Sequence, residues 1–471
     1  MGIGAALWGL IVLLAISFTS DHPWWALGLG GAGGLGLGIY FWWQTGRQLA
    51  SRLAAPRTGD LFSRMYRYEI LLLSPSLFFL VFASRLPTVL LFFALAWLFL
   101  VGCGRKVATG SFLSTAPLDL PILLVFLSTL PSLYAAVDLL QSGKAVCTLI
   151  AGMTLSYGLV TGVDTARKVH LAFFLFLVAG SGIALTTFLV MQLPHAKIPF
   201  VSAFYHYLPD LLPRKIHPNY IGGSLVFFIP LAFWVVVRRY GHIVWGSVCM
   251  GLTGSGLLMT QSRGALLATG AALVLTGAYW YRWLRLGLPV LILTGGLLFY
   301  TKGVESLFDP VAGSGLGNNL ENRWELWQRA VYITQDFPFT GIGIHSFPVV
   351  VDLLYPLFLS GADAGVPHAH NLYLEIVVSI GFPGFVAFWT LLGAWGGTVR
   401  ETLVRSRGSQ KKEYCEILGV GLAGGMIAHL LYSITDAIAL GEKGGVVFWA
   451  VLGLTVVLWR RARAEDNGDR L

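Results

Sequence analysis

Charged residues are scarce in this chain. Only 12% of its 471 residues are Asp, Glu, Lys or Arg, about half of the roughly 25% that soluble domains carry. A soluble globular protein, whose surface is exposed to water, is therefore excluded. Disorder is excluded as well, because disordered segments are poor in apolar residues, whereas 56% of this chain is hydrophobic and 13% aromatic. The class that remains is a polytopic membrane protein.

Cysteine and nucleotide-binding motifs are also lacking. The four cysteines lie far apart within apolar stretches (Cys103, Cys147, Cys249 and Cys415), which excludes a disulfide framework and a zinc site built on closely spaced cysteines. No Walker motif is present, and the Gly-x-Gly-x-x-Gly spacings at 28–33 and 31–36 lie inside the apolar run 24–43, so the sequence gives no indication of a nucleotide site.

Long apolar runs fill most of the chain, and a membrane-spanning helix needs about 20 such residues. We expect an all-α polytopic membrane protein with about 12–14 transmembrane helices and one large periplasmic loop. The fourteen candidate spans are residues 3–19, 24–43, 70–84, 86–103, 118–137, 145–163, 169–191, 220–237, 243–260, 264–281, 286–300, 372–395, 417–434 and 444–459.

The positive charges predict the orientation. If the N-terminus is inside and the spans alternate, 22 of the 32 lysines and arginines fall on the inside and 10 on the outside, as the positive-inside rule requires. We therefore expect both termini in the cytoplasm. The net charge of +9 is then an insertion signal, and we expect no nucleic-acid partner.

The spans divide the chain into three parts. Residues 1–300 should hold the first eleven spans with short loops, residues 301–371 a large outer loop, and residues 372–471 the last three spans and a cytoplasmic tail. A loop of this length usually has structure and function of its own. Within it, Trp324, Trp327 and Val331 have i, i+3, i+7 spacing, which predicts a helix over 322–334.

Polar residues that could carry chemistry gather on the predicted outer side. They are Arg214, Lys215 and His217 before the eighth span, Arg263 in the turn after the ninth, Arg323 in the large loop, and His368, His370, Asn371 and Glu375 at the twelfth span.

Arg263 lies in a tight turn between two spans, against the positive-inside bias. It could reach a lipid phosphate along its apolar stem. The alternative is an anionic ligand, because a guanidinium group binds phosphate through two hydrogen bonds.

His370 could act as a general base or acid near neutral pH, whereas Asn371 is equally a plain helix N-cap. Glu375 could orient His370 or pair with an arginine, and Asp436 is a weaker candidate at the end of the thirteenth span. The His-Ala-His pattern has no obvious third ligand near it in sequence, so we expect no metal.

Four segments together resemble the O-antigen ligase/Wzy polymerase superfamily of bacterial envelope glycosyltransferases. Thr-Gln-Ser-Arg-Gly at 260–264 is similar to the family's Ser-Arg-Gly turn. Asn-Arg-Trp-Glu-Leu-Trp at 322–327, followed by Pro-Phe-Thr-Gly-Ile-Gly at 338–343, is similar to its Arg-x-x-x-Trp…Pro-x-x-Gly-x-Gly stretch. His-Asn-Leu-Tyr-Leu at 370–374 is similar to its His-Asn-x-Tyr-Leu signature, and His-Pro-Asn-Tyr-Ile-Gly at 217–222 to its Pro-Asn-x-x-Gly segment.

The resemblance implies a GT-C-like, inverting and metal-independent enzyme of the bacterial inner membrane. The donor would be a glycan on undecaprenyl diphosphate, and the acceptor a lipid A–core sugar in ligases or another repeat unit in polymerases. Arg263 and Arg323 would stabilise the diphosphate, and His370 would deprotonate the acceptor. Binding would involve Arg214, Lys215, His217, His368, Asn371 and Glu375, with membrane lipids around the polyprenyl chain.

Other functions stay open beside the ligase, namely a Wzy-type polymerase, a protein O-glycosyltransferase and a lipid-linked oligosaccharide transporter. A transporter should place ionisable residues in the middle of spans or show discontinuous repeats. Here Asp119, Asp164, Glu375 and Asp436 all fall near span ends, which favours an enzyme that acts at one face.

Overall fold

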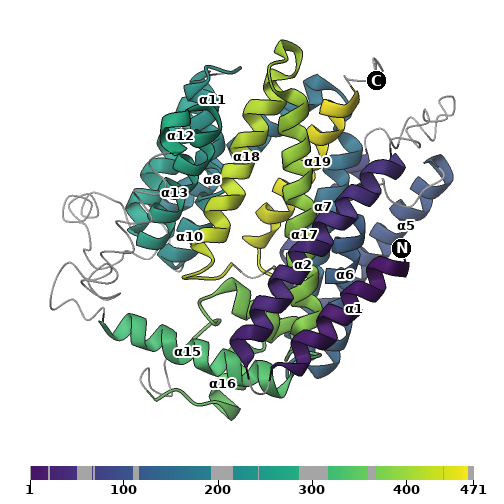
Figure 1. Cartoon of the computed structure of the whole chain (residues 1–471), viewed down its shortest axis with the longest axis vertical. Coiled ribbons are helices and arrows are strands. Elements are labelled where there is room, and N and C mark those ends of the chain that lie inside the picture. Colours follow the sequence, from purple (N-terminus) through teal and green to yellow (C-terminus); the bar gives the residue numbers. More distant parts are fainter. Residues whose placement is uncertain are drawn as a thin grey trace.

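The computed structural model describes residues 2–19, 22–49, 66, 69–109, 116–191, 216–241, 243–285, 317–358, 366–438 and 440–464. Within these ranges the regular structure is helical, and the sole β feature is an isolated bridge between Met191 and Ile216. The predicted all-α class is therefore confirmed. Most helices run side by side as a bundle, and two helices of the large loop, α15 and α16, lie at one end of it (Figure 1).

Every predicted span except 286–300, which lies outside the described residues, overlaps a helix or a pair of helices. Eight of the described helical segments are long and apolar enough to cross a membrane, which makes this a multi-pass membrane protein. The helices of the bundle are α1 (Gly2–Ser17), α2 (Pro23–Leu49), α4 (Glu69–Val81), α5 (Thr88–Thr109), α6 (Asp119–Ala135), α7 (Leu139–Gly162), α8 (Ala166–Leu189), α10 (Pro218–Leu225), α11 (Ile229–Val237), α12 (Ile243–Thr260), α13 (Arg263–Trp280), α17 (Leu372–Ser406), α18 (Glu413–Tyr432) and α19 (Gly445–Ala464).

Helix α17 is the centre of the bundle. It packs against α2 and α6, while α19 packs on α7 and α18 packs on α13 and α11. Nearly all of its apolar side chains are buried, including Val377, Phe382 and Phe388. An apolar helix that is buried on all sides is expected only where other helices, rather than lipid, surround it.

A kink at Ile380 and Gly381 joins α17 to the large loop. Gly381 has φ +64°. The backbone amide of the next residue, Phe382, donates to the Pro338 carbonyl at 2.8 Å. The carbonyls of Val378 and Ser379 accept from the amides of residues 342 and 343 at 2.9 and 3.1 Å. The loop segment 338–343 thus satisfies backbone groups that the kink releases from the helix.

Close approach explains the glycines of this segment. A Cβ on Gly341 would lie 2.6 Å from the Ser379 carbonyl oxygen, and a Cβ on Gly381 would lie 2.4 Å from the Phe339 carbonyl oxygen. Only glycine avoids both clashes and adopts the positive φ of these positions. The Pro-x-x-Gly-x-Gly stretch therefore attaches the large loop to α17 through close backbone contacts.

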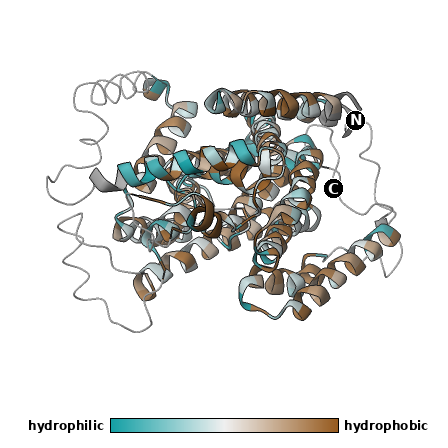
Figure 2. Cartoon of the chain, turned by 90° about the horizontal axis from the view of Figure 1, so that it is seen from below, coloured by the Kyte–Doolittle hydropathy of each residue, from teal (hydrophilic) through white to brown (hydrophobic). Residues whose placement is uncertain are grey.

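The large loop contains α15 (Gly317–Asp336) and α16 (Phe347–Leu354), so the helix predicted over 322–334 is confirmed. The apolar side of α15 buries Leu326, Ala330 and Ile333. Seen from below, the polar α15 crosses the end of the apolar bundle (Figure 2). The cluster that it joins includes Leu374 and Val378 of α17, so α15 covers the region where α17 begins.

Candidate active site

The start of α17 is fixed by Asn371. Its Oδ1 accepts from the amides of Tyr373 and Leu374, both at 3.0 Å, and its Nδ2 donates to the Ile434 carbonyl at 3.0 Å. The predicted N-cap is therefore confirmed. The Leu372 amide also donates to the Ser433 carbonyl at 2.9 Å. These bonds tie the beginning of α17 to the segment that follows α18.

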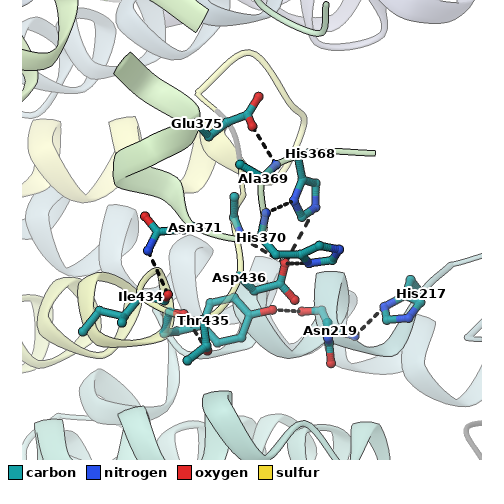
Figure 3. A network of polar contacts seen from close by, with 12 residues as sticks. His217, Asn219, His368, Ala369, His370, Asn371, Glu375, Ile434, Thr435 and Asp436 are labelled. Carbon is teal, nitrogen blue, oxygen red and sulfur yellow. Dashed lines mark hydrogen bonds and ion pairs between the residues drawn. The ribbon is translucent and has the colours of Figure 1, made fainter. Parts of the chain in front are cut away.

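This junction brings His370 to Asp436, 66 residues further along the chain (Figure 3). Their Nδ1 and Oδ1 atoms are 3.0 Å apart. Since an ionised carboxylate can only accept, Nδ1 of His370 carries the proton and donates it. In the neutral ring Nε2 is then an acceptor, and the His370 side chain remains 24% exposed.

Asp436 is buried and held in its ionised form. Burial alone would raise the pKa of its carboxyl, but the hydrogen bond from His370 and the positive charge of Arg323 hold this pKa well below its usual range. Its Oδ1 also accepts from the Ala437 amide at 2.9 Å. Asp436 is thus a fixed negative charge behind the imidazole.

His368 supports His370 from the other side. Its Nδ1 accepts from the His370 amide at 3.1 Å, and its Nε2 lies 3.7 Å from Asp436 Oδ1. Burial and the neighbouring His370 lower the pKa of His368 to about 4, although Asp436 acts in the opposite direction. His368 is therefore neutral at physiological pH and positions His370.

Backbone strain marks the same place. His370 has φ +49°, a left-handed conformation that is uncommon for residues other than glycine. Such strain persists only where the surroundings fix it, and it is frequent in active sites. Here the N-cap, the His368 bond and the Asp436 bond provide that fixation.

Glu375 lies one turn inside α17 and is almost fully buried. Its Oε2 accepts from the Ala369 amide at 3.0 Å, and its Oε1 accepts from the Ser379 hydroxyl at 3.3 Å. Of the two roles considered from sequence, these bonds fit the first, because they hold the backbone of the His-Ala-His segment. Substrate contacts by Glu375 and Asn371 stay predictions.

Two of the predicted arginines, Arg323 and Arg263, lie within the described region. Arg323 of α15 is close enough for its charge to act on both Asp436 and His368. Arg263 is the first residue of α13, and a Cβ on the next residue, Gly264, would lie 2.7 Å from the Thr435 hydroxyl. The Ser-Arg-Gly turn therefore lies against the residue that precedes Asp436.

His217 is the N-cap of α10, and its Nδ1 accepts from the Asn219 amide at 3.2 Å. The Tyr432 hydroxyl donates to the Asn219 carbonyl at 2.7 Å, which places this turn beside the end of α18 (Figure 3). Arg214 and Lys215 lie outside the described residues.

A cavity of about 660 Å³ opens beside the His370–Asp436 pair, within the range of about 300–1,000 Å³ typical of ligand sites. The polar side chains that line it are Ser84, Gln141, Lys144, Thr148, His217, Asn219, Tyr220, His345, His368, His370, Asp436, Glu442 and Lys443. Sequence reasoning ranked Asp436 low and did not single out Lys144, Glu442 or Lys443. The sequence could have indicated these residues only through their position in predicted outer segments.

A cation could find three ligands here. Ligand atoms of His368, His370 and Asp436 lie within 4.8 Å of one another, and two histidines with one carboxylate are a known metal set. The sequence did not reveal Asp436 as the third ligand. The charge of Arg323 acts on the same groups and opposes a bound cation. That this site works without metal stays a prediction.

A comparison with known protein families gives a match. Residues 248–389 match the O-antigen ligase family (Wzy_C). This range runs from α12 into α17 and contains Arg263, Arg323 and His370, while His217 and Asp436 lie outside it. No curated protein matches the chain. The segment 248–389 is thus similar to O-antigen ligases, which is consistent with the ordered motifs and with the helical membrane fold.

Proposed function

We propose that this protein is an O-antigen ligase of the bacterial inner membrane. It transfers a glycan from undecaprenyl diphosphate to a hydroxyl of the lipid A–core oligosaccharide at the periplasmic face, with both termini in the cytoplasm. The family match supports glycan transfer of the ligase or polymerase type. The observation that carries the proposal is the His370–Asp436 pair, which lines a cavity of ligand-binding size.

The proton step follows from the His370 tautomer. An acceptor hydroxyl attacks the anomeric carbon of the donor, and its proton passes to His370 Nε2. The bond between that carbon and the diphosphate oxygen breaks, and undecaprenyl diphosphate leaves with the electron pair. One direct displacement inverts the anomeric centre. The ionised Asp436 stabilises the imidazolium that forms.

The leaving group develops negative charge, which must be stabilised where it forms. We assign this role to Arg263 and Arg323, and Arg214 is a third candidate. Guanidinium groups keep their charge at all relevant pH values and match phosphate geometry, so no metal is required. Lys215 and His217 would add binding contacts, and the apolar bundle and membrane lipids would hold the polyprenyl chain.

The experiment offers two acceptors to the purified protein in lipid nanodiscs. A labelled undecaprenyl-diphosphate glycan is mixed with lipid A–core and with an unlabelled lipid-linked repeat unit. We expect label on lipid A–core. Label on a lengthened lipid-linked glycan identifies a polymerase. In a parallel sample reconstituted in liposomes, movement of the unchanged labelled donor across the bilayer identifies a transporter. His370→Gln should reduce transfer to a small residual rate, whereas His22→Gln, at an exposed residue outside the site, should leave it unchanged.

A further inference from the structure

A second group of cations lies at the cavity, away from the proposed diphosphate site. Lys144 of α7 and Lys443 of the segment between α18 and α19 both line it. Arg85 ends the short helix η2 (Ala83–Arg85), next to Ser84 in the cavity wall. Burial, together with the positive charge of Arg85, lowers the pKa of Lys443. Arg85, Lys144 and Lys443 are called the cationic wall below.

The fold builds this wall from three separate elements. Gln141, Lys144, Ala145 and Thr148 have i, i+3, i+4, i+7 spacing, which puts them on one face of α7. A Cβ on Gly441 would lie 3.0 Å from the Ala145 Cβ, so the 440–444 segment rests directly on that face.

The short helix η2 completes the arrangement. The Thr148 hydroxyl donates to the Leu80 carbonyl at 3.2 Å, just before η2, and the ammonium of Lys443 lies 4.9 Å from the centre of the Phe82 ring. Segments that are far apart in sequence therefore present their cations together.

Within the described part of the chain, the acidic side chains form ion pairs with none of Arg85, Lys144 and Lys443. Glu442 is adjacent in sequence, but burial and the carboxylates of Glu375 and Asp436 raise its pKa to about 8. It is therefore mostly neutral at pH 7 and does not repel an anion.

Unpaired cations on the outer side run against the positive-inside bias. Lys144 and Lys443 line the cavity and Arg85 follows Ser84 of its wall, so together they focus a positive potential there. We propose that the cationic wall binds an anionic substituent, phosphate or carboxylate, of the acceptor glycan. The inference rests on the proposed transferase function and adds to it the chemical class of the acceptor and its direction of approach.

The cationic wall is separate from Arg263 and Arg323, the arginines assigned to the diphosphate. Neither Arg263 nor Arg323 is among the described residues that line the cavity. The donor then reaches His370 from the side of α13 and α15, and the acceptor lies across the cavity, with its hydroxyl at His370 and its anion at Lys144 and Lys443. The two substrates are held by separate sets of positive charges.

The test is the double variant K144Q/K443Q. Loss of charge-assisted hydrogen bonds should raise the KM for lipid A–core about 10- to 100-fold, with kcat and the donor KM unchanged. The charge-retaining K144R/K443R should restore most of the affinity. Lys168→Gln, at the far end of the bundle on the α8 surface, is the matched control and should leave both constants unchanged.

Acceptor chemistry identifies the source of the anion. Lipid A–core treated with alkaline phosphatase tests phosphate, and carboxyl-reduced lipid A–core tests carboxylate. One of the two treatments should raise the acceptor KM of the wild type about as much as the K144Q/K443Q substitution does. The same treatment should not raise the acceptor KM of K144Q/K443Q any further. An unchanged acceptor KM in K144Q/K443Q overturns the proposal, as does a raised donor KM without a raised acceptor KM.

Direct binding separates this inference from the proposed function. Microscale thermophoresis of lipid A–core on the purified protein needs no turnover. If the wild type transfers nothing, the proposed function fails, yet weaker binding by K144Q/K443Q would still support an anion site. Equal binding by wild type and variant, with both folded by thermal melting, overturns the site itself.

Discussion

The bond between His370 and Asp436 makes a quantitative prediction for Asp436→Asn. The substitution keeps the size of the side chain but removes the negative charge that accepts the Nδ1 proton at 3.0 Å. The amide can instead donate to Nδ1, which favours the tautomer with the proton on Nε2. In that tautomer the ring cannot take a proton from the acceptor hydroxyl.

The size of the loss follows from two effects. A hydrogen bond to a charged group contributes about 1.5–3 kcal/mol, which corresponds to about a 10- to 100-fold change in rate. The tautomer effect adds to this, since the comparable Asp-to-Asn change in serine proteases costs about 10⁴-fold. We therefore expect kcat to fall by at least about 100-fold, with little change in either KM.

The assay is transfer of labelled glycan to lipid A–core in nanodiscs, with Asp436→Asn, His370→Gln and the double variant compared. If Asp436 acts through His370, the double variant should be no slower than His370→Gln. Multiplied losses in the double variant would refute the reasoning, and so would an Asp436→Asn protein with wild-type kcat. Thermal melting controls for folding.

Three further predictions concern charge and metal. Arg263→Gln and Arg323→Gln should each lower kcat by about 100-fold or more, because each removes a stabilising charge from the leaving diphosphate; full turnover by either variant would contradict this role. EDTA should leave transfer unchanged, whereas inhibition that zinc reverses would contradict the metal-independent mechanism. Because the pKa of Glu442 is raised from 4.5 to about 8 in the folded protein, the unfolded chain binds fewer protons between these values, and stability should fall as pH rises through that window. Glu442→Gln should remove this slope from melting temperatures recorded between pH 5 and 9, and an unchanged slope would show that other groups cause it.

Helix positions were largely predictable because each span is an apolar run that lipid or neighbouring helices can bury. The breaks were not. The span 220–237 is divided at Val226–Phe228 into α10 and α11, and α17 kinks at Ile380 and Gly381. The second break depends on hydrogen bonds from residues 338–343, which are distant in sequence. Periodicity reports local burial and contains no information about such partners.

The site was predictable in part for the same reason. His370 and Arg263 stand out locally, one at a helix start and the other in a polar turn between apolar runs. Asp436 becomes the partner of His370 only because the end of α18 is bonded to the start of α17 through Leu372 and Ser433. The cationic wall likewise requires α7, η2 and the 440–444 segment to meet. Spacing along the chain cannot reveal contacts that tertiary packing creates.

An experimental structure with undecaprenyl diphosphate bound would test the central claim most directly. The account predicts that the diphosphate contacts the guanidinium groups of Arg263 and Arg323 near His370, on the side away from Lys144. A diphosphate bound at the opposite end of the bundle, or in a cavity that His370 does not face, would contradict it.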